Sequence, residues 1–366
     1  MEKNTVFSRI INMNIKVLCA DEEVCRYVCR ELELHRCEDN EEKQNMIIDV
    51  KNEKFTINDD MKKVNECVYT DNCKVYICVQ AFLRKTWIAV DIQDKETSYV
   101  ELFIDKKNDK IKRLCTPNFQ YPWQNSVVDF FHGIFLWLIE NYMLEYGITL
   151  IHAAAFAYDE KKILLAADAA AGKSTVVDDI VLRHKGKYIS EDYCFVDNLG
   201  NVYGLFNQRR IITSRKECRG VGDFCNFLFF SIVKLMKIVS VESIRIRSTV
   251  ELYSKSDIIC QGCQCEGFFL MREKNKDTHF DCAERCVKVM EKEIRNWDGC
   301  IPLMMAIDVL KPDENVCENF WDRLNVVIRH NIYASSMRKI VISYMKTKEE
   351  FVDCVCYELE KEKHES

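Results

Sequence analysis

Short apolar runs alternate with charged segments over the first 120 residues. The runs are rich in β-branched and aromatic residues, and polar stretches such as residues 94–98, DKETS, separate them, which is typical of strands joined by solvated loops. Val24–Leu34 is expected to form a helix. The pattern predicts strands over Lys16–Cys19, Phe55–Ile57, Lys74–Gln80, Trp87–Ile92 and Tyr99–Ile104. We therefore expect a strand-rich α+β domain over residues 1–120, suited to recognising a partner or a peptide.

A long apolar segment follows this region. Pro122 is expected to begin a helix that ends near Gly147. Its apolar residues fall too densely for one face, which indicates packing on two sides. Residues 126–144 are the most apolar long stretch of the chain, but four polar side chains interrupt it at positions that would be costly in lipid. These are Asp129, His132, Glu140 and Asn141, and we expect a buried helix of a soluble protein.

Strands and helices alternate from residue 148 onward. Ile148–Tyr158 is predicted to be a strand that turns at Asp159 and Glu160 into a second strand, Ile163–Leu165. The later elements are expected to be a helix at Lys173–Arg183, strands at Lys187–Val196, Val202–Phe206 and Gly267–Met271, and helices at Cys282–Asn296, Cys317–His330 and Met337–Tyr344. This alternation indicates an α/β domain over residues 121–366 whose C-terminal helices cap the sheet.

Composition narrows the class of protein. The chain has 366 residues, of which 48% are hydrophobic and 30% charged, so we expect a globular protein of two domains. A net charge of −6 argues against binding nucleic acid through bulk electrostatics. The polar start, MEKNTVFSRI, lacks the apolar core of a signal peptide. We therefore expect a cytoplasmic protein that does not insert into a membrane.

The 20 cysteines are expected to be reduced thiols that pack as small hydrophobes. A metal site is the alternative for one cluster, Cys260, Cys263 and Cys265 together with Cys282 and Cys286. Its C-x-x-C-x-C spacing lacks the second C-x-x-C pair of a zinc ribbon. Scattered structural thiols are therefore the favoured interpretation.

A candidate phosphate-binding loop lies between the strand at 163–165 and the helix at 173–183. Residues 166–175 are AADAAAGKST, which resembles the end of the pattern G-x-x-x-x-G-K-[ST]. Gly172 lets backbone amides wrap a phosphate, Lys173 supplies a cation for the β and γ oxygens, and Ser174 supplies a hydroxyl for Mg²⁺. The start of the helix adds partial positive charge. The loop therefore predicts a nucleotide site that uses Mg²⁺, with the choice between ATP and GTP left open.

The loop departs from the full pattern at its first position, where Ala167 stands in place of glycine. The other small residues, Ala169, Ala170 and Ala171, keep close approach of the backbone to a phosphate feasible. The alternative is an alanine-rich turn in which Lys173 and Ser174 form a solvated helix start.

Three further polar residues stand in the neighbouring strands. His152 lies in the apolar strand 148–158, where a lone histidine is usually a satisfied core residue. Glu191 and Asp192 are adjacent in strand 187–196, and an apolar strand does not bury a charge without a partner. Such a carboxylate can hold Mg²⁺ or take a proton from an attacking hydroxyl; an edge strand with exposed acids is the alternative. The next segment offers cations that either neutralise transferred phosphate or form a solvated face: Arg209, Arg210 and Arg215.

The order of these features resembles the HPr kinase/phosphorylase family, and more closely its smaller HPr-kinase-like relatives. The matching stretch covers residues 148–213 and includes IHAAAFAYDEKKILLAADAAAGKSTVVDDIVLRHKGKYISEDYCFVDNLGNVYG. The resemblance implies a P-loop nucleotide-binding domain of the HPr-kinase/PEP-carboxykinase-like type. It further implies an ATP- and Mg²⁺-dependent phosphotransferase that acts on a hydroxyl group.

The resemblance also implies a role for each matching residue. Lys173 would hold the phosphates and Ser174 the Mg²⁺, with Thr175 in support and the amides of residues 169–173 around the phosphates. The first acid of the family's pair is the base; Glu191 matches it and Asp192 matches the second. Because the family has aspartate at the first place, either acid remains a candidate base, and Asp192 a candidate metal ligand. His152 would line the acceptor side.

The acceptor expected from the resemblance is a serine or threonine hydroxyl of a peptide or protein, including a precursor peptide in a peptide-modification pathway, or a small molecule. A homo-oligomer is compatible with the sequence. No match to the family's phosphorylase signature is present, so reverse phosphorolysis is not implied. Two other functions stay open: a catalytically inactive nucleotide-binding regulatory module, suggested by Ala167 and Glu191, and a hydrolase or phosphorylase that uses water or inorganic phosphate as acceptor.

Overall fold

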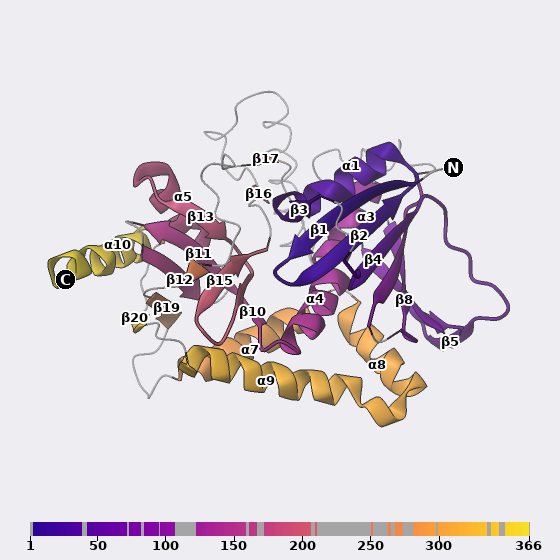
Figure 1. The fold of residues 1–366 in the computed structure, drawn as a ribbon. Coiled ribbons are helices and arrows are strands. Elements are labelled where there is room, and N and C mark those ends of the chain that lie inside the picture. The colour runs from indigo at the N-terminus through magenta and orange to yellow at the C-terminus, as the bar shows by residue number, and fades with distance from the viewer. Residues whose placement is uncertain are drawn as a thin grey trace, which may run out of the picture. The chain divides into compact units, whose positions relative to one another are not determined.

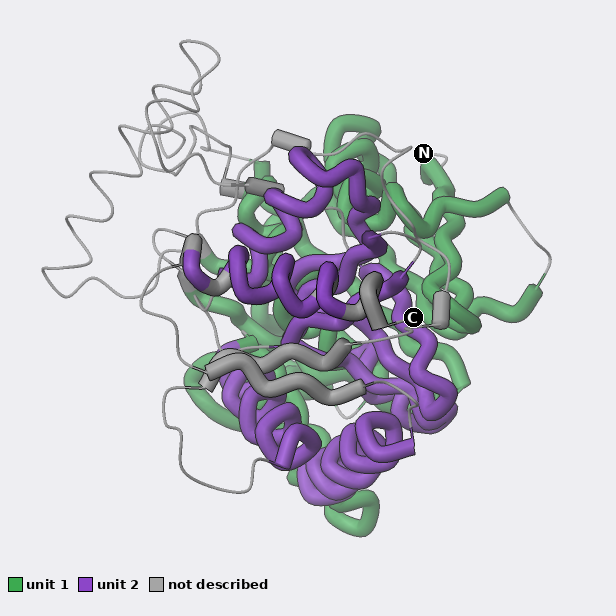
Figure 2. Tube along the Cα trace, turned by 90° about the vertical axis from the view of Figure 1, so that its left-hand side faces the viewer, with its two compact units in different colours: residues 1–137, 208–252, 297–316 green, residues 138–207, 253–296, 317–366 purple. Residues whose placement is uncertain are grey.

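Helices and sheets of mixed strand direction make up the fold in the computed structural model (Figure 1), which confirms the expected α/β class. The structure describes residues 3–38, 42–71, 73–81, 84–94, 96–106, 122–158, 161–166, 172–205, 209–210, 250–251, 263–264, 268–273, 281–297, 299–334, 338–343 and 348–365. The chain divides into two compact units (Figure 2). Unit 1 comprises residues 1–137, 208–252 and 297–316, and unit 2 comprises residues 138–207, 253–296 and 317–366.

Unit 1 is built on a nine-stranded sheet with the order β3-β1-β2-β4-β9-β8-β7-β6-β5. The pairs β2/β4 and β4/β9 are parallel and the other neighbours are antiparallel. A short antiparallel pair, β16 (Arg209–Arg210) with β17 (Val250–Glu251), also belongs to this unit. The strands of the large sheet are β1 (Asn4–Ile10), β2 (Met13–Cys19), β3 (Arg36–Cys37), β4 (Met46–Lys51), β5 (Lys62–Asn65), β6 (Val68–Thr70), β7 (Lys74–Ala81), β8 (Arg84–Asp91) and β9 (Ser98–Phe103).

Four of the five strands predicted for this region are confirmed as parts of β2, β7, β8 and β9. The fifth prediction, a strand at Phe55–Ile57, is wrong, because these residues form no strand. Phe55 instead packs on the sheet, with its ring centroid 4.4 Å from that of Trp87 and 5.3 Å from that of Tyr76. The aromatic character of this run therefore reflects burial against the sheet and not strand pairing.

Three α-helices are described in unit 1, namely α1 (Glu22–Glu31), α3 (Pro122–Phe131) and α8 (Cys300–Leu310). α1 confirms the helix predicted near Val24–Leu34 and begins at Asp21, whose carboxylate accepts the backbone N–H of Val24 at 3.0 Å. α1 packs on α3, α3 packs on β8, and α8 packs on β7. Two short 3₁₀ turns, Glu33–His35 and Pro312–Glu314, complete the helical elements described in this unit.

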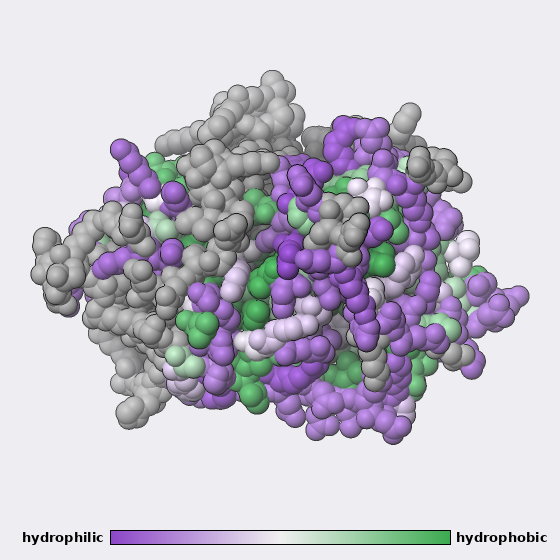
Figure 3. All heavy atoms as spheres, viewed as in Figure 1, coloured by the Kyte–Doolittle hydropathy of each residue, from purple (hydrophilic) through white to green (hydrophobic). Residues whose placement is uncertain are grey.

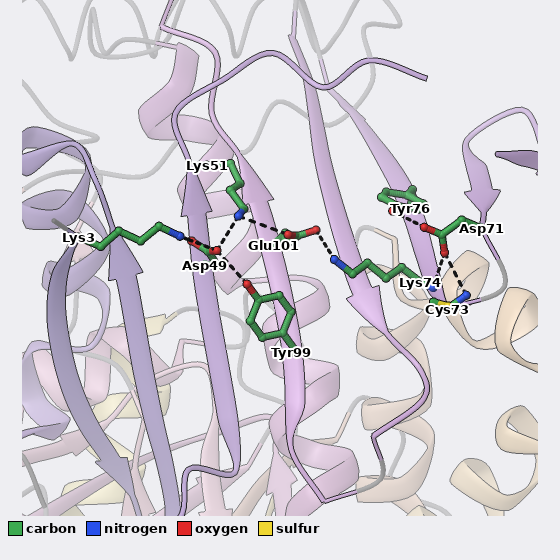
Figure 4. A network of polar contacts seen from close by, with 9 residues as sticks. All are labelled: Lys3, Asp49, Lys51, Asp71, Cys73, Lys74, Tyr76, Tyr99 and Glu101. Atoms are coloured by element: carbon green, nitrogen blue, oxygen red, sulfur yellow. Dashed lines mark hydrogen bonds and ion pairs between the residues drawn. The ribbon is translucent and has the colours of Figure 1, made fainter. Parts of the chain in front are cut away.

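A ladder of charges crosses the strands of the large sheet (Figure 4). The carboxylate of Asp49, whose side chain is 3% exposed, lies 2.6 Å from the Lys3 ammonium and 2.7 Å from that of Lys51. The Tyr99 hydroxyl donates to the same carboxylate at 2.8 Å, and Glu101 continues the ladder. Burial would raise the pKa of Asp49, but the hydrogen bonds from the lysines and Tyr99 hold it below its ordinary value. The pairing therefore keeps a buried charge in the middle of the sheet.

Unit 2 contains two further sheets. The first has the order β13-β11-β12-β19-β20, in which β12, β19 and β20 are parallel and β11 is antiparallel to both neighbours. The second is antiparallel, with the order β10-β14-β15-β18. The strands are β10 (Thr149–Ile151), β11 (Ala153–Tyr158), β12 (Lys161–Ala166), β13 (Lys187–Ser190), β14 (Cys194–Val196), β15 (Asn201–Gly204), β18 (Cys263–Gln264), β19 (Phe268–Glu273) and β20 (Arg338–Ser343).

Two segments that were each predicted as one strand are pairs of strands in different sheets. The segment Ile148–Tyr158 is interrupted at His152, which separates β10 from β11. The segment Lys187–Val196 is interrupted at Glu191–Tyr193, which separates β13 from β14. Because β10 pairs with β14 and β11 pairs with β13, both segments change sheets at the same place. The candidate site residues in these segments therefore lie at a sheet corner and not inside regular strands.

Two predicted helices differ from the structure, and two observed helices, Cys300–Leu310 and Lys348–Glu365, were not predicted. The helix expected from Pro122 to Gly147 is broken at His132–Gly133, which gives α3 and a separate helix α4. The helix predicted at Met337–Tyr344 is wrong, because residues 338–343 form the parallel strand β20. The helices described for unit 2 are α4 (Ile134–Leu144), α5 (Lys173–Arg183), α7 (Cys282–Arg295), α9 (Val316–Ala334) and α10 (Lys348–Glu365).

One helical segment in the described part of the chain, Trp123–Leu144, is long and apolar enough to cross a membrane by length and composition alone. Within the structure 89% of its most apolar 18-residue window is buried, and the core helix of a soluble protein passes the same test of length and composition. On the face of the molecule drawn in Figure 3, hydrophilic residues cover most of the described surface.

Glu140 is one of the polar residues in this apolar segment, and its hydrogen bonds explain why it is there. Its side chain is fully buried and accepts hydrogen bonds from the Thr149 hydroxyl at 2.6 Å and from the Leu150 backbone N–H at 2.8 Å. Glu140 thus holds the start of β10 against α4. Burial raises its pKa to about 8, although both hydrogen bonds favour the charged form.

Replacing Glu140 by glutamine is expected to make the protein less sensitive to alkaline pH. Because the pKa is raised from 4.5 to about 8, stability from the protonated form is fully present below pH 4.5 and is lost as the pH rises through about 8. The loss is on the order of 5 kcal/mol in the free energy of unfolding. Glutamine stays neutral and keeps an acceptor for Leu150.

Urea denaturation at about pH 6 and about pH 9 measures the part of this loss that falls between these two pH values, which is about 3 kcal/mol. The wild type should lose stability over this interval and Glu140→Gln should not. Glu145→Gln is the matched control, because the Glu145 side chain is 60% exposed. An equal loss in wild type and Glu140→Gln would contradict the assignment.

Candidate functional site

The strand register of unit 2 gathers the site residues at the sheet corner. Ala153 lies opposite Ala166, so the end of β12 reaches the place where His152 interrupts the β10–β11 segment. Ala155 lies opposite Ser190, so the residues that follow β13 meet the same corner. The corner is therefore built from His152, from the end of β12 at Ala166, and from Glu191–Tyr193.

Helix α5 begins at this corner after the candidate phosphate loop. Its N-cap is Gly172, whose φ of +110° is a conformation that a residue with a Cβ adopts only with strain. Lys173 is the first helical residue and is buried, Ser174 is exposed and Thr175 is half-buried. The N–H groups of the first turn have no partners within a helix and can bind an anion. The other predicted loop residues, Ala167, Ala169, Ala170 and Ala171, lie outside the described residues.

A buried chain of polar contacts runs from Lys173 through His152 to Glu293. The Lys173 ammonium lies 3.2 Å from Nε2 of His152, and Nδ1 of His152 lies 3.4 Å from Oε1 of Glu293. The Tyr193 hydroxyl donates to Oε2 of the same carboxylate at 3.2 Å. Lys173 is 5% exposed and His152 is 6% exposed. His152 is therefore not an isolated core residue, because it lies between a cation and a carboxylate.

This arrangement determines the tautomer of His152. An ammonium can only donate, so Nε2 accepts from Lys173 and Nδ1 carries the proton that faces Glu293. The nearby His152 ring, whose Nδ1 lies 3.4 Å from Oε1, is the largest influence on Glu293 and lowers its pKa against the opposing effect of burial. Glu293 is thus an ionised carboxylate that orients the imidazole.

Glu191 and Ser174 form the second part of the site. Burial raises the pKa of Glu191 to about 8, and the charge of Asp192 raises it further, while a hydrogen bond with Ser174 opposes the shift. Asp192 is exposed and has a φ of +65°, in the left-handed region. The two acids therefore differ in environment: Glu191 faces the start of α5, and Asp192 faces solvent.

Sequence reasoning missed Glu293 and Tyr193. Glu293 lies on α7 and is 141 positions away from His152 in the chain, so no local motif contains both residues. One signal was present: Cys286 and Met290 on α7 are buried, and Glu293 follows them at helical spacing on the same stripe. A carboxylate on a buried stripe requires a partner, and that partner is His152.

Among the described residues, none of the remaining candidates is found at this corner. The backbone of Arg209 and Arg210 forms β16 in unit 1, and Arg215 lies outside the described residues. Of the cysteine cluster, Cys260 and Cys265 also lie outside them, while Cys282 and Cys286 are buried on α7. The described cysteine side chains are free thiols, and many are buried, as expected for reduced structural residues.

Comparison with known proteins adds no family: no protein-family model matches the chain, and no curated protein matches its sequence. The chemistry of the site therefore rests on its own geometry.

Glu293→Gln is expected to destabilise the protein at neutral pH but not in acid. Because the folded pKa of Glu293 is lowered, its stability contribution is present above the ordinary carboxyl value of 4.5 and is lost as the pH falls through the folded pKa. The difference in Tm between wild type and variant should therefore shrink as the pH falls below 4.5. Thermal unfolding monitored by circular dichroism over this range measures it. Glu291→Gln on the same helix is the control, and a Tm difference independent of pH would refute the ionised pair.

Proposed function

We propose that this chain is an ATP- and Mg²⁺-dependent kinase that transfers the γ-phosphate to a hydroxyl group. The observation that carries the proposal is the buried Lys173 at the start of α5, in contact with His152 and beside the Glu191–Ser174 pair. A cation, helix N–H groups and a carboxyl of raised pKa thus meet at one corner. These are the groups that phosphoryl transfer needs, because its transition state is stabilised mainly by positioned charge.

The proposed fold is a P-loop nucleotide-binding domain of the HPr-kinase/PEP-carboxykinase-like type. It is supported by the order β12, loop, α5 and by the parallel pairing of β12 with β19. The left-handed N-cap at Gly172 supports it as well, since the loop pattern requires glycine immediately before the lysine. The resemblance over residues 148–213 agrees with this order.

The residues at the corner fit a magnesium ion. Mg²⁺ prefers hard oxygen ligands, often one or two carboxylates together with substrate phosphates. The Ser174 hydroxyl is hydrogen-bonded to Glu191, and the exposed Asp192 carboxyl follows immediately in the chain. Ser174 and Asp192 would hold the ion, with Glu191 adjacent. When bound, Mg²⁺ neutralises charge on the phosphate oxygens.

Glu191 is the proposed general base. A base is most efficient when its pKa lies near the working pH, and burial places the pKa of Glu191 at about 8. Its carboxylate would take the proton of the acceptor hydroxyl as the oxygen attacks the γ-phosphate. Lys173 would neutralise the phosphate oxygens. Glu293 would keep the His152 imidazole oriented beside Lys173, on the acceptor side.

The proposed acceptor is a serine or threonine of a peptide or protein, including a precursor peptide. Support comes from the resemblance alone, and a small-molecule hydroxyl belongs to the same chemistry. An inactive nucleotide-binding module and a hydrolase are the alternatives, and the assays below distinguish all three.

Lys173→Met is expected to lower acceptor-dependent γ-phosphate turnover by at least about a hundredfold, because removing one charge-stabilising donor typically costs about 3 kcal/mol in the transition state. Methionine keeps much of the buried volume, so the fold should persist. Purified wild type and variant are compared with [γ-³²P]ATP and Mg²⁺, with and without serine-bearing peptides.

Lys187→Met is the control for this comparison, since Lys187 is an exposed lysine of β13. Full activity in a folded Lys173→Met protein would contradict the proposed kinase function. Nucleotide binding without turnover would identify a regulatory module, and release of phosphate without an acceptor would identify a hydrolase.

The pH dependence of kcat/KM distinguishes the two acids. Activity should rise with pH to a plateau with a midpoint of about 8, because the ionised form of Glu191 is the active one. Glu191→Gln should abolish this rise and lower the rate by about 10²–10⁴-fold. Asp192→Asn should lower the rate because it removes a proposed Mg²⁺ ligand, and the activity that remains should rise with a midpoint at lower pH, because the charge that raises the pKa of Glu191 is gone. Loss of the rise in Asp192→Asn alone would assign the base to Asp192.

A further inference from the structure

A second cluster of polar side chains lies at the opposite end of α5 from the proposed kinase site. It consists of Asp179 on α5, His184 at the C-cap of α5, and Cys356 on α10. One carboxylate oxygen, one ring nitrogen and one sulfur lie within 4.8 Å of one another. Each residue belongs to a different ligand type, and the set joins two helices that are distant in sequence.

The backbone fixes His184 at this position. Its N–H donates to the carbonyl of Ile180 at 3.1 Å, and the N–H of Gly186 donates to the same carbonyl at 3.0 Å, which closes the end of α5. A Cβ at Gly186 would lie 2.7 Å from the carbonyl oxygen of Ala157, so this helix end is pressed against β11. The Tyr158 ring meets the imidazole edge-on at 6.1 Å. His184 is thus held by both its backbone and its ring.

The carboxylate of Asp179 is divided between two partners. Oδ1 lies 2.8 Å from the Arg183 guanidinium, and Oδ2 lies 3.3 Å from Nε2 of His184. Oδ2 and Nε2 therefore lie close enough to bind one ion, while Arg183 holds the other carboxylate oxygen. A metal ligand that is held by a second hydrogen bond in this way has a fixed direction.

Cys356 reaches the cluster because α10 packs on α5. Val352 and Val355 of α10 are buried, and Cys356 follows on the same face. Its thiol is half-buried, and the His184 side chain is 39% exposed, so an ion can enter from solvent. The negative end of the α5 dipole lies here and favours a cation.

We infer that Asp179, His184 and Cys356 form a zinc site that fastens α10 to the end of α5. Zn²⁺ accepts sulfur, imidazole nitrogen and carboxylate oxygen together, in tetrahedral sites whose fourth position is open to water. Calcium and magnesium would not select a thiol or an imidazole. Binding displaces the thiol proton to solvent and leaves Nε2 of His184 on the metal. The zinc site is independent of the proposed phosphotransfer, because it uses none of the same side chains.

Cobalt(II) titration of the full-length protein, after removal of metal with a chelator, tests the site. Wild type should show a thiolate-to-cobalt charge-transfer band that Zn²⁺ abolishes by displacement. Cys356→Ser and His184→Gln should each weaken cobalt binding at least about tenfold. Cys354→Ser is the matched control, since Cys354 lies two residues away on α10 and is outside the cluster.

Hydrogen exchange gives a second readout that does not depend on colour or activity. Zn²⁺ should slow exchange of the amides of residues 348–365 in wild type and in Cys354→Ser, but not in His184→Gln. The His184 side chain is partly exposed, so His184→Gln is expected to fold even where Cys356→Ser does not. The proposed zinc site would be contradicted if wild type showed no cobalt–thiolate band. It would also be contradicted if the band were unchanged in both Cys356→Ser and His184→Gln.

Discussion

The constraint on which unit 2 depends is the simultaneous change of sheet by two strand segments. β10 and β14 pair in one sheet and β11 and β13 pair in the other, so neither segment can change sheets without the other. The backbone between the paired strands cannot join either ladder. His152 and Glu191–Tyr193 occupy these two interruptions. Polar side chains are tolerated at an apolar corner because the backbone there is already irregular.

The charges at the corner are stable only as a connected set. Lys173 and His152 are almost fully buried, and a buried charge without a partner costs several kcal/mol. Glu293 completes the set from α7, and Tyr193 satisfies its second oxygen. This links the start of α5 to a helix that follows it by more than a hundred residues. The site is thus assembled by the tertiary fold and not by the loop motif alone.

Local patterns in the sequence predicted much of the fold. Runs rich in β-branched and aromatic residues predicted β7, β8 and β9, and the helix predicted at residues 282–296 is α7, which Asp281 caps in the structure. The prediction for residues 337–344 was wrong because the run Ile340, Val341, Ile342 has the β-branched character of a buried parallel strand, which periodicity alone cannot separate from a short helix. β20 is paired with β19, and that partner is not evident from the local sequence.

The candidate site was predictable only in part. Lys173, Ser174, Glu191 and His152 were identified from residue type and order. The break in each predicted strand could not be identified from the sequence. The residues that flank the breaks are buried and apolar, so each segment reads as one continuous strand; they include Leu150, Ile151, Cys194 and Phe195. Glu293 was missed because its partner lies in another part of the chain. Distant pairing, and not local preference, decides these features.

Asp192 shows how backbone geometry affects the use of future sequence comparisons. At a φ of +65° glycine, asparagine and aspartate are tolerated, and most other residues are strained. Homologues would therefore retain this narrow set at position 192 even if phosphotransfer had been lost. Invariance at position 192 would therefore indicate only that the turn is kept. Glu191 and Glu293 have no unusual backbone angle, so retention of both residues together would indicate selection for the chemistry of the site.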